Sequence, residues 1–187
     1  MNTSTIVLIV IAGLLVLLAF YVIGVYNKLV NARNKVDNQF SQVDIQLKRR
    51  ADLIPNLVET VKGYAKHEEG TLTAVIEARN KAVSATSIND KVEANNQLTG
   101  ALNKLFALSE SYPELKANEN FLQLSSDLTS VEDEIAQSRK YYNAVVRDYN
   151  NKVEMIPSNI VAKVLGFKSK LMFVANDEER QNVRVKL

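Results

Sequence analysis

The chain has 187 residues, a formal net charge of +2, no cysteine, no tryptophan, one histidine and three prolines. The absence of cysteine excludes disulfides, thiolate metal ligands and a cysteine nucleophile. Because acidic and basic residues nearly balance, the chain has no overall positive field and predicts no nucleic-acid partner. Its low content of proline and glycine is typical of an all-α protein.

Residues 1–26 are predicted to hold a short N-terminus and a transmembrane helix. Ile6 to Val25 form an uncharged run, IVLIVIAGLLVLLAFYVIGV. A helix of about 20 apolar residues spans the hydrocarbon core of a bilayer. A cleaved signal peptide would have a basic start, a shorter apolar core and a small-x-small cleavage site, and these features are missing. We therefore expect the lipid bilayer to be a partner through this run.

The flanking residues predict the orientation of the span. Tyr21, Tyr26 and Lys28 lie at its C-terminal end, where aromatic and basic side chains favour the membrane interface. Lys28, Arg33 and Lys35 follow the run, whereas no basic side chain precedes it. The positive-inside rule then predicts a single-pass protein with its N-terminus outside and the remaining chain in the cytoplasm.

Beyond residue 26, apolar residues recur at spacings of three and four, as in amphipathic helices. Three turn-forming stretches interrupt them: RADLIP, SATSIND and SYPELKAN. In the first stretch, Asp52 is interpreted as a helix N-cap and Pro55 as part of a first helical turn. The predicted fold is an up-down-up-down antiparallel four-helix bundle over 27–156, with helices at 27–50, 55–84, 91–111 and 118–155. The alternative joins the first two helices in one kinked rod, as in a coiled-coil stalk.

The distal end of this bundle is the predicted interaction site. If the membrane helix continues into the bundle, Lys48 lies about 33 Å beyond Tyr26. Salt screens the charge of lipid headgroups over roughly 10 Å, so the cations at this end are too far from the anchoring membrane to bind its headgroups. Antiparallel threading brings SYPELKAN to the same end. The competing interpretation is a solvated turn with weak surface ion pairs. The candidate tip residues are Lys48, Arg49, Arg50, Asp52, Tyr112, Pro113, Glu114 and Lys116.

Residues 157–187 are predicted to form a partly amphipathic tail. The stretch SNIVAKVLGFKSKLMFV places Ile160, Val161 and Val164 near one helical face, together with several lysines. The tail is expected either on the membrane surface or along the bundle. Nearby, the Tyr-Asn pairs at 142–143 and 149–150 are interpreted as hydrogen-bonding groups between helices close to the membrane.

The sequence predicts no enzyme and no cofactor. A di-iron site in a four-helix bundle needs Glu-x-x-His on two helices, and the single His67 has Tyr64 three residues before it. There is no Gly-rich phosphate loop, nucleophile elbow or zinc pattern. Polar residues on the apolar seams, among them Arg33, Glu68 and Arg79, are interpreted as partly buried pairs that fix helix register.

Three long stretches closely resemble the LemA family: YNKLVNARNKVDNQFSQVDIQLKRRADLIPNLVETVKGYAKHE, LTGALNKLFALSESYPELKANENFLQL and SRKYYNAVVRDYNNKVEMIPSNIVAKVLGF. Ala51 departs from this pattern, which commonly has an aromatic residue there. The resemblance implies a bacterial inner-membrane protein with a cytoplasmic helical bundle and no established enzyme activity. LemA genes often neighbour those of membrane metallopeptidases and envelope-stress proteins. That neighbourhood implies an association with such a peptidase and a role in envelope homeostasis.

The functional expectation is a membrane-anchored, non-enzymatic interaction or scaffold module that binds a protein partner or further copies of itself. The alternative is a signal transducer that couples the state of the bilayer or envelope to a cytoplasmic partner.

Overall fold

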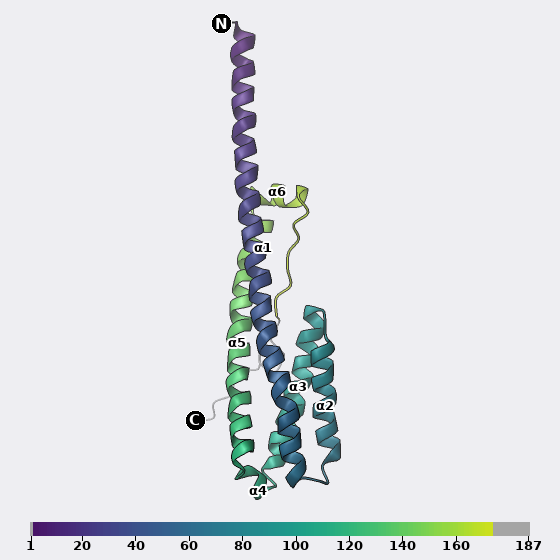
Figure 1. Ribbon diagram of the computed structural model, residues 1–187. Helices are drawn as coiled ribbons and strands as arrows, with labels where there is room; N and C mark the ends of the chain where they lie inside the picture. The colour runs from purple at the N-terminus through teal and green to yellow at the C-terminus, as the bar shows by residue number, and fades with distance from the viewer. Residues whose placement is uncertain (1, 174–187) are drawn as a thin grey trace, which may run out of the picture. The chain divides into compact units, whose positions relative to one another are not determined.

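The computed structural model describes residues 2–173, and within this range every regular element is an α-helix (Figure 1). The all-α fold with a long apolar N-terminal helix is therefore confirmed. The helices are α1 (Thr3–Tyr64), α2 (Glu69–Ser84), α3 (Ile88–Ser109), α4 (Pro113–Lys116), α5 (Glu119–Glu154) and α6 (Ser158–Val164). Residues 174–187, which belong to the expected tail, lie outside the described residues.

The chain divides into two compact units. Within the described residues, the anchor unit comprises residues 2–40 and 142–172, and the bundle unit comprises residues 41–141 together with Phe173. Both α1 and α5 contribute to each unit. The segments expected from the sequence, 1–26, 27–156 and 157–187, are consecutive, whereas each compact unit combines segments that are distant along the chain.

The turn expected between Arg50 and Pro55 is not formed, because α1 continues through Pro55 to Tyr64. The predicted separation of helices 27–50 and 55–84 is wrong at this point. A proline inside a helix cannot donate to the carbonyl four residues earlier, which here belongs to Ala51. Arg79 of α2 donates to that carbonyl from Nε at 3.2 Å, and Ala51 and Ile54 are buried. This substitute hydrogen bond and the buried apolar surface offset the cost of the proline, about 3 kcal/mol.

The bundle unit has one apolar core shared by five helical segments: residues 41–64 of α1, α2, α3, the short α4 and residues 119–141 of α5. Ser87 Oγ caps α3 by accepting from the Asp90 amide at 3.1 Å, and Asn118 Oδ1 accepts from the Phe121 amide at 3.0 Å. These caps confirm the second and third predicted turns. The core residues are Ile54, Leu57, Val58, Val61, Ala65, Leu72, Val75, Ala78, Leu98, Leu102, Leu105, Leu115, Phe121 and Leu128.

The anchor unit consists of the first part of α1, the last part of α5, α6 and the strap, defined as residues 165–172. Three α5 side chains hold the strap by its backbone. Tyr142 Oη donates to the Leu171 carbonyl and Tyr149 Oη to the Lys168 carbonyl, each at 3.0 Å. The Asn150 amide donates to the Lys170 carbonyl and accepts from the Lys170 N–H, each at 2.9 Å. Tyr142, Tyr149 and Asn150 therefore bind an extended segment, not another helix as the sequence predicted.

Candidate interaction surface

The structure separates the predicted tip into two groups of residues. Lys48, Arg49, Arg50 and Asp52 lie within α1, in the middle of the bundle unit. Tyr112, Pro113, Glu114 and Lys116 lie at the α3–α5 connection, in and beside α4. The prediction that both groups share one end is therefore wrong. Its physical cause is the extension of α1, which moves the first turn to residues 65–68.

Arg50 is not a surface cation. Its side chain is almost fully buried, and Nη2 lies 2.9 Å from Glu132 Oε2 of α5 and 2.9 Å from Thr99 Oγ1 of α3. Burial lowers the pKa of the guanidinium, the charge of Glu132 raises it and that of Arg139 lowers it. Arg50 therefore joins three helices of the bundle unit. This buried contact fits a structural role better than the exposed docking role predicted for it.

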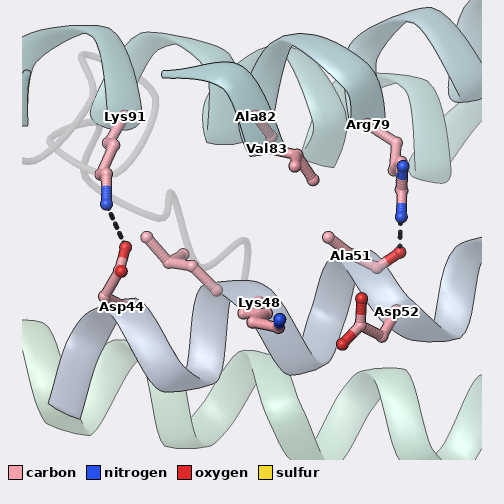
Figure 2. Close-up of a pocket in the computed structure, with 9 residues that line it drawn as sticks. Asp44, Lys48, Ala51, Asp52, Arg79, Ala82, Val83 and Lys91 are labelled. Atoms are coloured by element: carbon pink, nitrogen blue, oxygen red, sulfur yellow. Dashed lines mark hydrogen bonds and ion pairs between the residues drawn. The ribbon is translucent and has the colours of Figure 1, made fainter. Parts of the chain in front are cut away.

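The neighbouring predicted residues lie on the surface of the bundle unit. Arg49 Nη1 forms an exposed ion pair with Glu134 Oε2 at 3.1 Å. Lys48 and Asp52 line a cleft of about 410 Å³ between α1, α2 and α3 (Figure 2). The Lys91–Asp44 ion pair lies at one end of the drawn cleft and the Arg79–Ala51 hydrogen bond at the other. The remaining lining residues, Leu47, Ala82 and Val83, are apolar.

Two loops meet at one end of the bundle unit and form what we call the end surface: residues 64–68 and 110–118. Tyr112 Oη donates to Glu68 Oε1 at 3.1 Å, and Asn118 Nδ2 donates to Tyr64 Oη at 2.9 Å. Leu115 is fully buried and fixes α4 on the core. The end surface is therefore held both by cross-loop hydrogen bonds and by an apolar anchor.

The end surface carries exposed acidic and basic side chains. Pro113, Glu114 and Lys116 are exposed, and Lys116 pairs with Glu110. A shallow hollow of about 340 Å³ lies between Tyr64 and the residues from Ser111 to Leu115. The hydrogen bond to Glu68 is the main cause that raises the pKa of Tyr112, with smaller contributions from burial and the Glu68 charge. The hydroxyl therefore stays protonated as a donor at neutral pH.

Tyr64 and Glu68 are contributors that the sequence prediction missed. Both were assigned to the interior of a helix beginning at Pro55. The available signal was the run Lys66-His67-Glu68-Glu69-Gly70, which contains no apolar residue between two apolar seams. His67 is exposed in this turn. In residues 2–173, no group of three or more His, Cys, Asp or Glu side chains is arranged to hold a metal ion.

The predicted membrane-interface residues lie along α1. Tyr21 and Tyr26 are exposed, as are most of the large apolar side chains of the run Ile6 to Val25. Among the described helices, α1 alone is long and apolar enough to cross a membrane by length and composition. Tyr26 also contacts Phe167 of the strap, with ring centroids 6.0 Å apart, a contact the sequence did not predict.

A long, exposed apolar helix that continues into a helical bundle fits the class of membrane-anchored helical proteins. The model of the LemA family matches residues 39–187. The chain belongs to the LemA family.

Curated relatives extend this finding. The chain is 30% identical over 168 residues to Protein LemA of Metamycoplasma hominis, an alignment that covers 88% of this chain and 75% of the relative. It is 26% identical over 169 residues to Magnetosome protein MamQ 2 of Paramagnetospirillum magneticum, covering 76% of this chain. Magnetosome protein MamQ of Magnetospirillum gryphiswaldense is 25% identical over a similar alignment. The chain spans 62% of the length of each of these two MamQ proteins.

Proposed function

We propose that this protein is a membrane-anchored, non-enzymatic interaction module that presents the end surface of its bundle unit to a protein partner. The observation that carries the proposal is the pair of cross-loop hydrogen bonds, Tyr112 to Glu68 and Asn118 to Tyr64. Loops that are already ordered lose less conformational entropy on binding, so a preformed surface supports affinity. The exposed Pro113, Glu114 and Lys116 add a rigid ring and both signs of charge.

The proposal places the protein in the bacterial inner membrane as a single-pass protein, with its N-terminus outside and the bundle unit in the cytoplasm. Lys28, Arg33 and Lys35 after the apolar run support this orientation. The cysteine-free chain allows a direct test with Thr3→Cys and Glu110→Cys. An impermeant maleimide added to spheroplasts should label the first variant and leave the second unlabelled until the membrane is permeabilised. The reverse pattern would overturn the orientation.

The docking role is tested by a photo-crosslinking residue at Glu114 in cells that produce the full chain. The matched control carries the same residue at Lys104, which is exposed on α3 outside the end surface. Adducts should form from position 114 and decrease when Lys116→Glu reverses a neighbouring charge. Equal adducts from both positions, or none from either, would contradict the end surface as the docking site.

The mass of the adduct identifies the partner class. A second copy of the chain would give twice the mass of the protein and establish self-association. A different mass would identify a heterologous partner, and the family resemblance makes a membrane metallopeptidase the first candidate. In either case the module would support envelope homeostasis by holding its partner at the membrane.

A signal transducer is the second candidate, because α1 is one helix from Thr3 to Tyr64 and contains both the apolar run and residues of the bundle core. Such a helix could transmit a change in the bilayer to the bundle unit. Replacing the apolar run by an unrelated apolar helix of equal length should then change Glu114 crosslinking without changing membrane insertion. Unchanged crosslinking would favour the scaffold role.

A further inference from the structure

The segment around α6 exposes an unusual number of large apolar side chains for its length. Ile156 is 81% exposed, Ile160 64% and Val164 79%, comparable with Leu17 in the apolar run at 67%. Met155 and Leu165 are also exposed. The opposite side of α6 is buried through Val161 and Ala162. This face, which we call the α6 apolar face and define as Met155, Ile156, Ile160, Val164 and Leu165, is not covered by protein in the described structure.

The α6 apolar face lies near the point where the apolar run of α1 ends. Phe167 of the strap contacts the Tyr26 ring, and Tyr26 directly follows Val25, the last residue of the run. The Arg33 guanidinium also lies over the Phe167 ring, 5.5 Å from its centre. Because α6 ends three residues before Phe167, the Cα atom of its last residue lies within about 11 Å of the Phe167 Cα atom. In the view of Figure 1, α6 is drawn crosswise to α1.

The strap restrains the position of α6. Hydrogen bonds from Tyr149 and Asn150 of α5 fix Lys168 and Lys170, which follow Phe167 by one and three residues. Lys170 Nζ also pairs with Asp37 of α1 at 3.1 Å. The segment is therefore tied to both long helices of the anchor unit, to α1 at Asp37 and to α5 at Tyr149 and Asn150.

The charges of the segment suit a lipid surface. Residues 155–172 contain three lysines and no acidic residue. Lys163 and Lys168 are exposed beside the α6 apolar face. Short segments that pair an apolar face with lysines lie in the plane of a bilayer, with the apolar face at the boundary between headgroups and acyl chains.

We propose that α6 lies in the interfacial layer of the membrane that α1 crosses, with Ile156, Ile160 and Val164 in contact with lipid acyl chains. The inference rests on the proposed membrane anchoring but is independent of its orientation, because it specifies only the end of the span. The anchor unit would then contact the bilayer at two places, along the membrane-spanning part of α1 and at the α6 apolar face. The paired contact would restrict tilting and rotation of α1 relative to the membrane surface.

The test uses the full chain in vesicles of phosphatidylcholine and phosphatidylglycerol, with a bimane probe on Ile160→Cys. Three single-cysteine controls accompany it. Leu17→Cys reports on the span, and Asn38→Cys reports on an exposed α1 site about 18 Å beyond Tyr26. Ile45→Cys is the matched control because it is an exposed apolar site in the bundle unit.

The expected result is a blue-shifted emission at positions 160 and 17, with quenching by nitroxide-labelled lipid and protection from aqueous iodide. Positions 38 and 45 should show the opposite pattern. Iodide access at position 160 equal to that at 38, with position 17 protected, would overturn the α6 proposal while leaving the anchor intact. Iodide access at position 17 would overturn the membrane anchor and the α6 proposal together.

A second measurement tests whether the lipid contact depends on the α6 side chains or only on the affinity of the bimane probe for lipid. With the probe on Leu165→Cys, the double substitution Ile160→Asp and Val164→Asp should abolish quenching by nitroxide-labelled lipid. Leu122→Asp, at an exposed apolar residue of the bundle unit, should leave that quenching unchanged. Retained quenching in the double variant would contradict lipid contact through the α6 apolar face.

Discussion

Arg79 Nε donates a hydrogen bond to the Ala51 carbonyl at 3.2 Å, and this is the carbonyl that Pro55 leaves without its helical donor. The bond links α1 and α2 at the edge of the cleft drawn in Figure 2. It explains how α1 continues through a proline without a turn. Arg79, interpreted from the sequence as a member of a partly buried pair that fixes helix register, binds a backbone carbonyl.

Arg79 and Pro55 should therefore be energetically coupled. We expect Arg79→Met to lower the free energy of unfolding by about 1 to 3 kcal/mol, because the Ala51 carbonyl loses its donor. In a Pro55→Ala background the residue 55 amide can donate instead, so the same substitution should cost less. Urea denaturation of the four proteins of this double-mutant cycle measures the coupling. Strictly additive effects would contradict it, and Lys104→Met on α3 controls for loss of a cation.

Arg50 and Arg49 are adjacent but should respond very differently to loss of their partners. Glu132→Ala leaves the buried Arg50 charge without its ion pair, and we expect a loss of about 2 to 4 kcal/mol, moderated because Glu132 is half exposed. Glu134→Ala removes the exposed partner of Arg49 and should cost about 1 kcal/mol or less. Thermal and urea unfolding of both variants provide the comparison, and equal losses would refute a special role for burial.

The hydrogen bond between Tyr112 and Glu68 should make the end surface sensitive to alkaline pH. Because the folded pKa of Tyr112 is raised, the protonated hydroxyl is favoured in the folded state. The stabilisation that the protonated Tyr112 hydroxyl contributes is fully present below the pKa of about 10 that tyrosine has in the unfolded chain. It is lost as the pH rises through the higher pKa that Tyr112 has in the folded protein. Tyr112→Phe should remove this component of the pH dependence of thermal unfolding. An identical alkaline profile in Tyr112→Phe would show that Tyr112 does not contribute, since Tyr142 and Tyr149 remain as the other perturbed hydroxyls.

The strap should depend on Asn150 for its order. The Asn150 side chain both donates to the Lys170 carbonyl and accepts from the Lys170 N–H. We expect Asn150→Ala to accelerate hydrogen exchange of the Lys170 amide, with a loss of about 1 to 2 kcal/mol of local protection. Asn151→Ala, at the exposed neighbour, is the matched control. Unchanged exchange in Asn150→Ala would mean that other contacts hold the strap.

The sequence by itself determined those features that depend on local patterns. The uncharged run Ile6 to Val25 indicates a membrane-crossing helix because its length matches a bilayer. Apolar spacings of three and four identify the helices, and the caps at Ser87 and Asn118 confirm where two of the turns fall. The long matching stretches also identify the family, because they extend over nearly the whole chain.

Only the tertiary structure decided between local signals that conflict, such as a helix start against a continuing helix, or an exposed cation against a buried one. Pro55 and Asp52 together form a valid helix start, yet burial of Ala51 and Ile54 and the donor from Arg79 keep α1 intact. Arg50 has the same local character as Lys48 and Arg49, but only the packing of three helices shows it to be buried. Tyr112 bonds to Glu68 across 44 residues of sequence and Asn118 bonds to Tyr64 across 54, and no local pattern encodes such contacts. The structural effect of a proline or a charged residue can be predicted only when the helix packed against it is known. That neighbouring helix supplies the hydrogen-bond donor that the proline lacks or the opposite charge that the charged residue needs.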